Sequence, residues 1–179
     1  MKKELSLREF LLDDYNLIKQ EINNSKAIMQ WAGQKYKYPL SWEQMNMQMQ
    51  ERDEEGKKKN WLFTAIEESS KAAIGHGQIS IRDKGKKIAS IGSVLVFQKY
   101  RGLGYSATLM NSLMSYGFSE LGMNELRLGV FDFNLPAIKC YTNVGFTQSS
   151  FESKAIEIDG EKWDLIKMNK LKHEYSCPI

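Results

Sequence analysis

Two glycines and an arginine lie between a segment that predicts a strand and a segment that predicts a helix. Residues 98–110 read QKYRGLGYSATLM and contain Arg101, Gly102 and Gly104. Glycine weakens helices and strands because it costs backbone entropy on folding. A helix N-terminus offers unpaired N–H groups and a partial positive charge, so its natural ligand is an anion, most often a phosphate. The stretch therefore predicts a site for a phosphate-bearing ligand.

A dinucleotide is one candidate for that ligand, because Gly102-x-Gly104-x-x-Ala107 matches a dinucleotide-binding fingerprint. Such a loop would follow the first strand of a parallel sheet, with an acidic residue about 20 positions later. Here three predicted antiparallel strands come first, and the nearest acid at a strand end, Asp132, lies well beyond that distance. The pattern disfavours a dinucleotide. A glycine turn without a ligand would leave the Arg-Gly-x-Gly cluster unexplained.

A second motif follows after one predicted helix and one predicted strand. Residues 134–146 read NLPAIKCYTNVGF and resemble the NxxAxxxYxxxGF segment of the Gcn5-related N-acetyltransferase (GNAT) superfamily. Residues 96–106 resemble the pyrophosphate loop of that family, R-G-x-G-x-[GA], with Ser106 in place of its last Gly or Ala. The two motifs stand in the family's order. The resemblance extends over nearly the whole chain and implies an N-acetyltransferase that uses acetyl-CoA.

The resemblance implies a mixed α/β fold with a twisted, mostly antiparallel sheet of six or seven strands. The sheet would be splayed centrally, with acetyl-CoA between the splayed strands and about four helices around it. Hydrophobic periodicity predicts the elements themselves. Strands are expected at residues 4–10, 61–67, 72–82, 87–97, 124–133, 147–158 and 161–171, and helices at 11–22, 105–121 and 135–143 and after Ser41, with Gln44 as a capping-box partner. We expect a single acetyltransferase domain over residues 1–179.

The resemblance also implies how the cofactor would be held. Backbone N–H groups of the loop would bind the pyrophosphate, and the main chain of Val94 and Val96 would pair with the pantetheine arm. A strand amide near these valines would then face the thioester carbonyl as an oxyanion donor. The residues expected in the loop are Arg101, Gly102, Leu103, Gly104, Tyr105 and Ser106. Asn134 would bond the pantetheine arm or a water, although helix capping explains it equally well.

Tyr141 occupies the family's general-acid position and would protonate the leaving thiolate. A thiol with a pKa of about 8.5 takes a proton from a phenol with a pKa near 10 at a cost of roughly 2 kcal/mol. The alternative is a tyrosine that only packs its ring on the sheet. Cys140, its neighbour, is expected to point away from Tyr141 and to pack.

The incoming amine poses a separate problem, because an alkylamine is only about 0.1% neutral at pH 7, a penalty of roughly 4 kcal/mol. A general base would help. The position where many relatives carry Glu is Ser90, so His76, between two glycines that would open space beside it, and Asp132 are the candidates. A lone strand histidine is more often structural. A proton relay without a single base remains open.

The acceptor side is expected in the loop of residues 30–40, which is rich in aromatic residues. Trp31, Tyr36 and Tyr38 could wall an amine pocket, including by cation–π contact, or could simply pack on the core. The acceptor would be a small-molecule amine, or a protein N-terminus or lysine. The alternative function is a catalytically idle acyl-CoA sensor or partner-docking module, which the missing Glu at position 90 favours and which Tyr141 and Asn134 oppose.

Composition restricts the remaining classes of function. The net charge of +3 is too small, and its basic residues too scattered, to indicate nucleic acid. The sequence contains no apolar run of about 20 residues and no signal-peptide pattern, so we expect no membrane association and a cytoplasmic location. Two cysteines are too few for a disulfide framework or a zinc cluster, and we expect no metal. Many members of the family are dimers, so a homodimer is compatible with the sequence.

Overall fold

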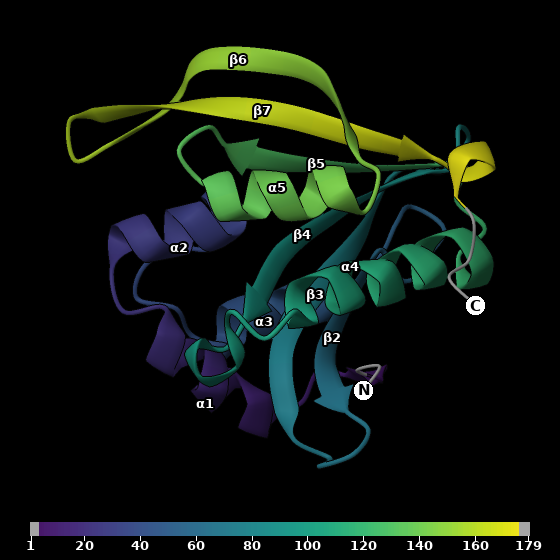
Figure 1. Cartoon of the computed structure of the whole chain (residues 1–179), viewed down its shortest axis with the longest axis horizontal. Helices are drawn as coiled ribbons and strands as arrows, with labels where there is room; N and C mark the ends of the chain where they lie inside the picture. The colour runs from purple at the N-terminus through teal and green to yellow at the C-terminus, as the bar shows by residue number, and fades with distance from the viewer. Residues whose placement is uncertain (1–3, 176–179) are drawn as a thin grey trace.

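The computed structural model describes residues 4–175, which form a seven-stranded sheet with helices on both faces (Figure 1). The sheet order is β1-β2-β3-β4-β5-β7-β6. The strands are β1 (Leu5–Glu9), β2 (Asn60–Glu67), β3 (Ala73–Asp83), β4 (Ile88–Val96), β5 (Glu125–Phe131), β6 (Thr147–Ile158) and β7 (Glu161–Leu171). The helices are α1 (Leu12–Glu21), α2 (Ser25–Ala32), α3 (Trp42–Gln50), α4 (Tyr105–Ser115) and α5 (Leu135–Asn143).

The sheet is antiparallel except where β4 meets β5, and this parallel pair is short. Its register runs from Ile88 opposite Glu125 to Ser90 opposite Arg127, and the described residues pair no further. Beyond that point the two strands diverge, so the inner edge of β4 no longer has a neighbouring strand (Figure 1). The predicted mixed fold with a centrally splayed, mostly antiparallel sheet is confirmed.

Two hydrophobic clusters hold the helices to the sheet. On one face the apolar side of α4, with Met110, Leu113 and Met114 almost fully buried, packs on the central strands. On the other face α1, α2 and α3 form a second cluster, in which Ile18 and Met45 are fully buried. Figure 1 shows α4 in front of the sheet and α3 behind it. The sheet is therefore covered around the place where β4 and β5 separate.

Helix α2 was not among the predicted elements, and this corrects the expected extent of the acceptor loop. Asn24 begins the helix, since its side chain accepts a hydrogen bond from the Ala27 N–H at 2.8 Å. The helix runs to Ala32, with Ile28 and Trp31 buried, so the first three residues of the loop expected at residues 30–40 are helical. Ser41 caps α3 as predicted. The Gln44 side chain bonds instead to the backbone of Lys37 and Pro39, which ties down the loop before α3.

Asp14 is a buried carboxylate that anchors the start of α1 to the sheet. It accepts hydrogen bonds from both Arg8 Nη atoms at 2.8 and 3.0 Å, from the Leu11 N–H at 2.8 Å and from Thr64 Oγ1 at 2.7 Å. Burial favours the neutral acid, but the bonds from Arg8, Thr64 and Leu11 outweigh it and hold the pKa of Asp14 below its ordinary value. The charged form therefore stabilises the fold.

We expect Asp14→Asn to lower the free energy of unfolding by about 2 kcal/mol at pH 7, because charge-assisted bonds are lost. A carboxyl with a lowered pKa stabilises the protein above its unfolded pKa near 3.9, and this contribution disappears as the pH falls through the folded pKa. The difference between wild type and variant should therefore shrink below about pH 4. Urea denaturation at pH 7 and at pH 3.5 measures it, and an equal difference at both pH values would contradict the assignment.

Within residues 4–175, no helix combines the length and the apolar character that crossing a membrane would require.

Candidate active site

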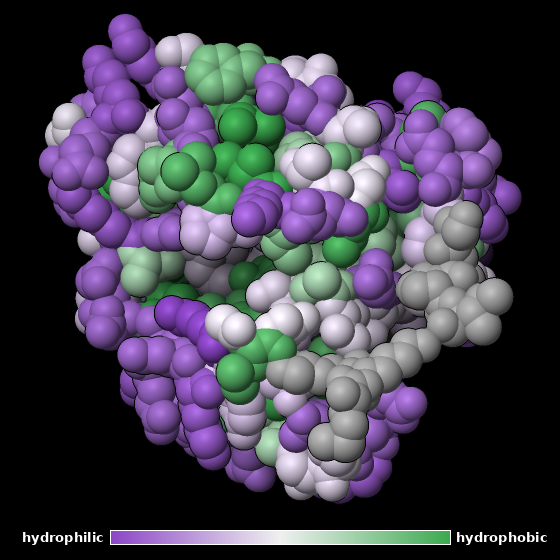
Figure 2. All heavy atoms as spheres, viewed as in Figure 1, coloured by the Kyte–Doolittle hydropathy of each residue, from purple (hydrophilic) through white to green (hydrophobic). Residues whose placement is uncertain are grey.

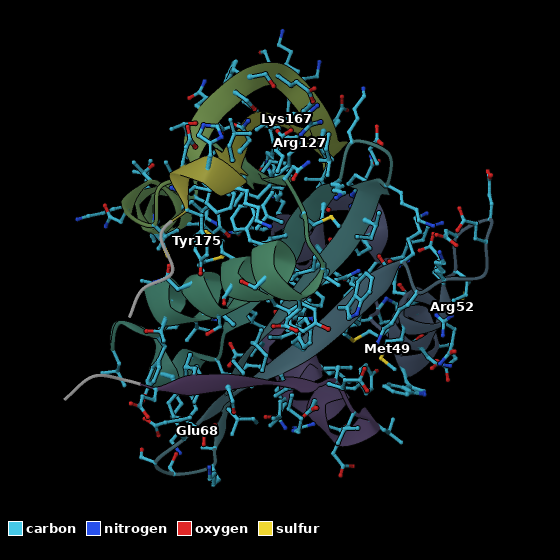
Figure 3. The ribbon with its side chains drawn as sticks, turned by 90° about the vertical axis from the view of Figure 1, so that its right-hand side faces the viewer. Met49, Arg52, Glu68, Arg127, Lys167 and Tyr175 are labelled. Atoms are coloured by element: carbon cyan, nitrogen blue, oxygen red, sulfur yellow. The ribbon has the colours of Figure 1, made fainter. Side chains whose placement is uncertain are left out.

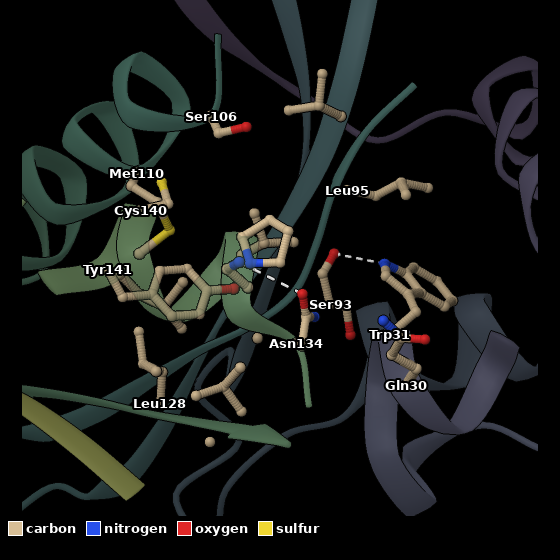
Figure 4. Close-up of a pocket in the computed structure, with 18 of the residues that line it drawn as sticks. Gln30, Trp31, Ser93, Leu95, Ser106, Met110, Leu128, Asn134, Cys140 and Tyr141 are labelled. Atoms are coloured by element: carbon tan, nitrogen blue, oxygen red, sulfur yellow. Dashed lines mark hydrogen bonds between the residues drawn. The ribbon is translucent and has the colours of Figure 1, made fainter. Parts of the chain in front are cut away.

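A cavity of about 480 Å³ opens where β4 and β5 diverge. Figure 2 shows this face of the molecule hollowed, with hydrophobic side chains in the hollow. Figure 4 shows Tyr141 reaching in from one side and Trp31 and Ser93 on the other. The walls of the cavity come from residues 91–96 of β4, residues 128–130 of β5, and Ser106 and Met110 of α4. Residues 136, 137, 140 and 141 of α5, Asn134 before it, and residues of α1 and α2 complete them.

The glycine loop has open space beside its backbone, and Arg101 and Ser106 at its two ends line the cavity. Gly102 and Gly104 have φ angles of +72° and +84°, which are readily adopted only by glycine. A Cβ added at either position would meet no heavy atom of the described chain within 4 Å. Gly104 precedes the first turn of α4, whose N–H groups no N-cap side chain covers. The open space beside this backbone would admit a phosphate at close range.

Arg101 shapes the loop through contacts that the sequence analysis missed. Its Nε donates to the Val96 carbonyl at 2.9 Å, and its Nη2 donates to Glu21 Oε2 at 2.7 Å. The other oxygen of Glu21 accepts from the Gln98 N–H at 2.7 Å. Glu21 at the end of α1 therefore fixes both ends of the turn that precedes α4. No local signal in the sequence links these residues, which lie 77 and 80 positions apart.

The other residues predicted to hold the cofactor lie partly in the walls of the cavity and partly outside them. Val94, Val96 and Ser106 all line it. Leu103 is exposed at the tip of the loop. Tyr105 is buried, and its hydroxyl donates to Glu67, so it anchors the start of α4. The unpaired edge of β4, the glycine loop and the apolar walls fit an extended ligand that carries phosphates at one end, as acyl-CoA does.

A bulge in β4 marks the beginning of the cavity. Gln78 on β3 lies opposite Gly92, whereas His76 lies opposite Leu95, so β4 has one extra residue there. Ser93 in this bulge has a φ of +50° and is buried. Its carbonyl accepts a hydrogen bond from Trp31 Nε1 at 2.8 Å (Figure 4). Bulges of this kind redirect a strand next to functional sites.

Tyr141 enters the cavity from α5, on the side opposite Trp31 (Figure 4). Burial first, and then the neighbouring Cys140, raise the pKa of the Tyr141 phenol above its ordinary value. The phenol therefore stays protonated at neutral pH and is available as a hydrogen donor. Asn134 also lines the cavity, and its side chain accepts from the Ala137 N–H at 3.4 Å, so it caps α5.

Cys140 lies elsewhere than expected, because it lines the same cavity as Tyr141. It also packs against the main hydrophobic cluster, which agrees with a packing role. Burial raises the pKa of its thiol, which keeps the thiolate scarce at neutral pH.

His76 is not brought to the cavity. Its ring is fully buried between Phe10, at a centroid distance of 5.0 Å, and Trp31, at 5.8 Å. Burial, and then nearby Lys35, lower the pKa of His76 to about 3, so the ring is neutral near pH 7. The flanking glycines do not open space beside it. A Cβ at Gly75 would lie 2.4 Å from the Leu95 carbonyl oxygen, so the glycine serves close packing instead.

The remaining residues predicted for the base and the acceptor pocket differ in whether they reach the cavity. Asp132 is exposed just after β5 and does not line the cavity. Trp31 lines it, whereas Tyr36 is buried behind Trp31, with ring centroids 5.4 Å apart, and bonds Gln78 Oε1 at 3.2 Å. Tyr38 is 50% exposed, away from the cavity walls. One of the three aromatic residues predicted to bind the acceptor therefore reaches the site.

Comparison with known proteins places this geometry in a family. The family model described as "Acetyltransferase (GNAT) family" matches residues 25–146. The uncharacterized N-acetyltransferase YokL of Bacillus subtilis is 27% identical over 124 residues, which cover 69% of this chain and 68% of that protein. The spermidine N(1)-acetyltransferase of Vibrio cholerae is 21% identical over 175 residues, covering 98% and 97% of the two chains.

Solved structures show the same fold. The crystal structure of spermidine N-acetyltransferase from Vibrio cholerae, in complex with CoA and spermine, matches with a TM-score of 0.79 at 20% identity. The match covers 95% of this chain and 96% of that one. The family match spans both the glycine loop and the segment that carries Tyr141. The chain therefore belongs to the GNAT family of acetyltransferases.

Proposed function

We propose that this protein transfers an acetyl group from acetyl-CoA to the primary amine of a small molecule by direct attack. The observation that carries the proposal is that Arg101 and Ser106, at the two ends of the glycine loop, line the same cavity as Tyr141, and that this cavity forms where β4 and β5 separate. Acetyl-CoA, when bound, supplies an acetyl thioester. We also propose that residues 1–179 act as one domain in the cytoplasm.

The residues of the chain divide the binding work between them. Backbone N–H groups at Gly102, Gly104 and the first turn of α4 would hold the pyrophosphate. The free inner edge of β4 at Val94 and Val96 would pair with the pantetheine arm as an added strand. An amide on this edge would also stabilise the charge that develops on the carbonyl oxygen. Asn134, which lines the same cavity as Val94 and Val96, would position the pantetheine arm or a water while it caps α5.

In the reaction the amine nitrogen forms a bond to the acetyl carbon and the C–S bond breaks. The amine loses one proton and the departing sulfur gains one. Tyr141 would supply the proton to the sulfur, and because its pKa is raised, transfer should accompany the development of charge rather than follow full ionisation of the phenol. The residues proposed as bases, His76 and Asp132, lie away from the cavity walls, which favours a water relay for the amine proton.

A thermal melt with acetyl-CoA, and with NAD as a control, tests the cofactor. At a hundredfold excess over its dissociation constant a ligand adds about 2.7 kcal/mol to stability, which is roughly a 5–10 °C shift for a domain of this size. A panel of amines scored by thiol release then tests turnover, and it includes spermidine because similar proteins are named for it. A shift without thiol release from any amine would favour the idle sensor instead.

A further inference from the structure

A lysine ammonium lies against the β4 bulge at the beginning of the cavity. Lys35 ends a short 3-10 turn (Gly33–Lys35) after α2. Its Nζ is 3.4 Å from Ser93 Oγ, and a Cβ added to Gly92 would lie 3.5 Å from it. Gly92 and Ser93 both line the cavity. The ammonium therefore lies beside the part of β4 that follows its last pairing with β5, which is at Ser90.

This ammonium has no counter-ion in the part of the chain that the structure describes. No carboxylate of residues 4–175 lies within salt-bridge distance of Lys35. Glu51 is the carboxylate whose charge acts on it, but the Glu51 oxygens are held by Lys59 Nζ at 2.6 Å and Asn60 Nδ2 at 2.7 Å. Partly burying a cation without a partner is unfavourable, so a structural role alone does not account for it.

Arg82 is a second cation, and its charge acts on Lys35 although it lines a separate surface pocket. Arg82 on β3 bonds Ser90 Oγ at 2.7 Å, and it too has no carboxylate of residues 4–175 within salt-bridge distance. Burial first, and then Arg82, lower the pKa of Lys35 to about 8, while Glu51 opposes the shift, so Lys35 is still mostly charged at pH 7. Asp53, Glu54 and Glu55 line that surface pocket with Arg82, and Lys84 bonds Asp53 and Glu55. His76 is neutral, and Asp14 is paired with Arg8.

Charge then decides between classes of acceptor. A polyamine carries several positive charges, which the Lys35 ammonium would repel. An amine that also carries an acidic group would place its anion against this ammonium. We propose that Lys35 selects an acceptor amine that bears a carboxylate or a phosphate. This inference rests on the proposed acetyl transfer and names the substrate class of the same site.

The test measures kcat/KM by thiol release at pH 7 with acetyl-CoA and matched pairs of acceptors. β-Alanine is compared with its amide, O-phosphoethanolamine with ethanolamine, and spermidine serves as the polycation. The two acidic amines separate a carboxylate from a phosphate. We expect at least one acidic amine to exceed its neutral partner and spermidine by tenfold or more, which corresponds to about 1.4 kcal/mol.

Variants assign the preference to Lys35. Lys35→Met keeps the length of the side chain without its charge and should reduce the acidic-to-neutral ratio at least tenfold, whereas Lys35→Arg should largely retain it. Arg52→Gln is the matched control, because it removes one charge from an exposed arginine whose side chain donates to the backbone carbonyls of Met49 and Glu51 (Figure 3). Lys35→Met should fold at least as well as wild type, since it removes an unpaired, partly buried cation.

Each other outcome has a defined meaning. Preference for spermidine, or equal rates within both pairs, overturns the selection by charge and leaves the acetyl transfer standing. An equal fall for both members of a pair in Lys35→Met would place the lysine in the chemical step and also overturn selection. If no amine is turned over, the proposed function fails. Thermal melts with 10 mM O-phosphoethanolamine or β-alanine then test the anion site at Lys35 by itself. A higher melting temperature in wild type that is lost in Lys35→Met would support the site, and no shift in wild type would overturn it.

Discussion

Tyr141→Phe is expected to lower kcat by about 10²- to 10⁴-fold, the usual contribution of a positioned general acid. The substitution removes one hydroxyl from the cavity and leaves a ring of nearly the same shape. The expected size rests on the position of the phenol, which enters the cavity from α5 and remains protonated at neutral pH. Binding of acetyl-CoA, measured by calorimetry, should stay within about threefold of wild type.

Tyr116→Phe is the matched control for this prediction. Tyr116 is also a partly buried tyrosine whose pKa is raised by burial, but it packs on Phe63 at a centroid distance of 4.7 Å and does not line the cavity. It should keep wild-type kcat. If both variants retained full turnover, a water would protonate the sulfur and Tyr141 would only pack. A parallel loss of turnover and acetyl-CoA binding in Tyr141→Phe would instead indicate a binding role.

Local signals in the sequence were sufficient for most of the fold. The helix after the glycine loop shows its apolar face directly, and Met110, Leu113 and Met114 are buried as that spacing requires. The hairpin of β6 and β7 begins and ends at the predicted residues. Helix α2 has eight residues, a length at which periodicity is weak, and its signal was Asn24 at the N-cap, confirmed by the bond to the Ala27 N–H.

The residues of the site were likewise predictable where local structure fixes them, and not where contacts across the fold do. Residues fixed by a turn or a helix face, such as Gly104, Asn134 and Tyr141, could be placed from the motifs, and all border the cavity or its loop. Residues whose role depends on contacts across the fold could not. His76 looked accessible between two glycines, but the glycines admit the backbone of β4 and a leucine of α4. Lys35 meets Ser93 across 58 positions, through a bulge that no sequence rule places.

A substitution in the glycine loop is expected to have the second large effect. Glycines with a positive φ occur both in this loop and away from the cavity, so backbone strain and ligand binding can be tested separately. Gly104→Ala should weaken acetyl-CoA binding by tenfold to a hundredfold, which corresponds to about 1.4–2.7 kcal/mol. The added Cβ would meet no protein atom within 4 Å, so it would occupy the space through which a pyrophosphate must approach the backbone. The φ of +84° also disfavours alanine, and we expect about 1 kcal/mol of lost stability from that alone.

Gly122→Ala isolates the strain. Gly122 has a φ of +64°, and a Cβ there would likewise meet nothing within 4 Å, but it lies after the π-helical turn (Tyr116–Glu120) and away from the cavity. Both variants should lose similar stability in urea denaturation, and Gly104→Ala alone should lose affinity for acetyl-CoA by calorimetry. Equal affinities would mean that the open backbone at Gly104 does not face the ligand. The phosphates would then have to bind elsewhere along the loop, and the stability lost by both variants would reflect only the strain at a positive φ.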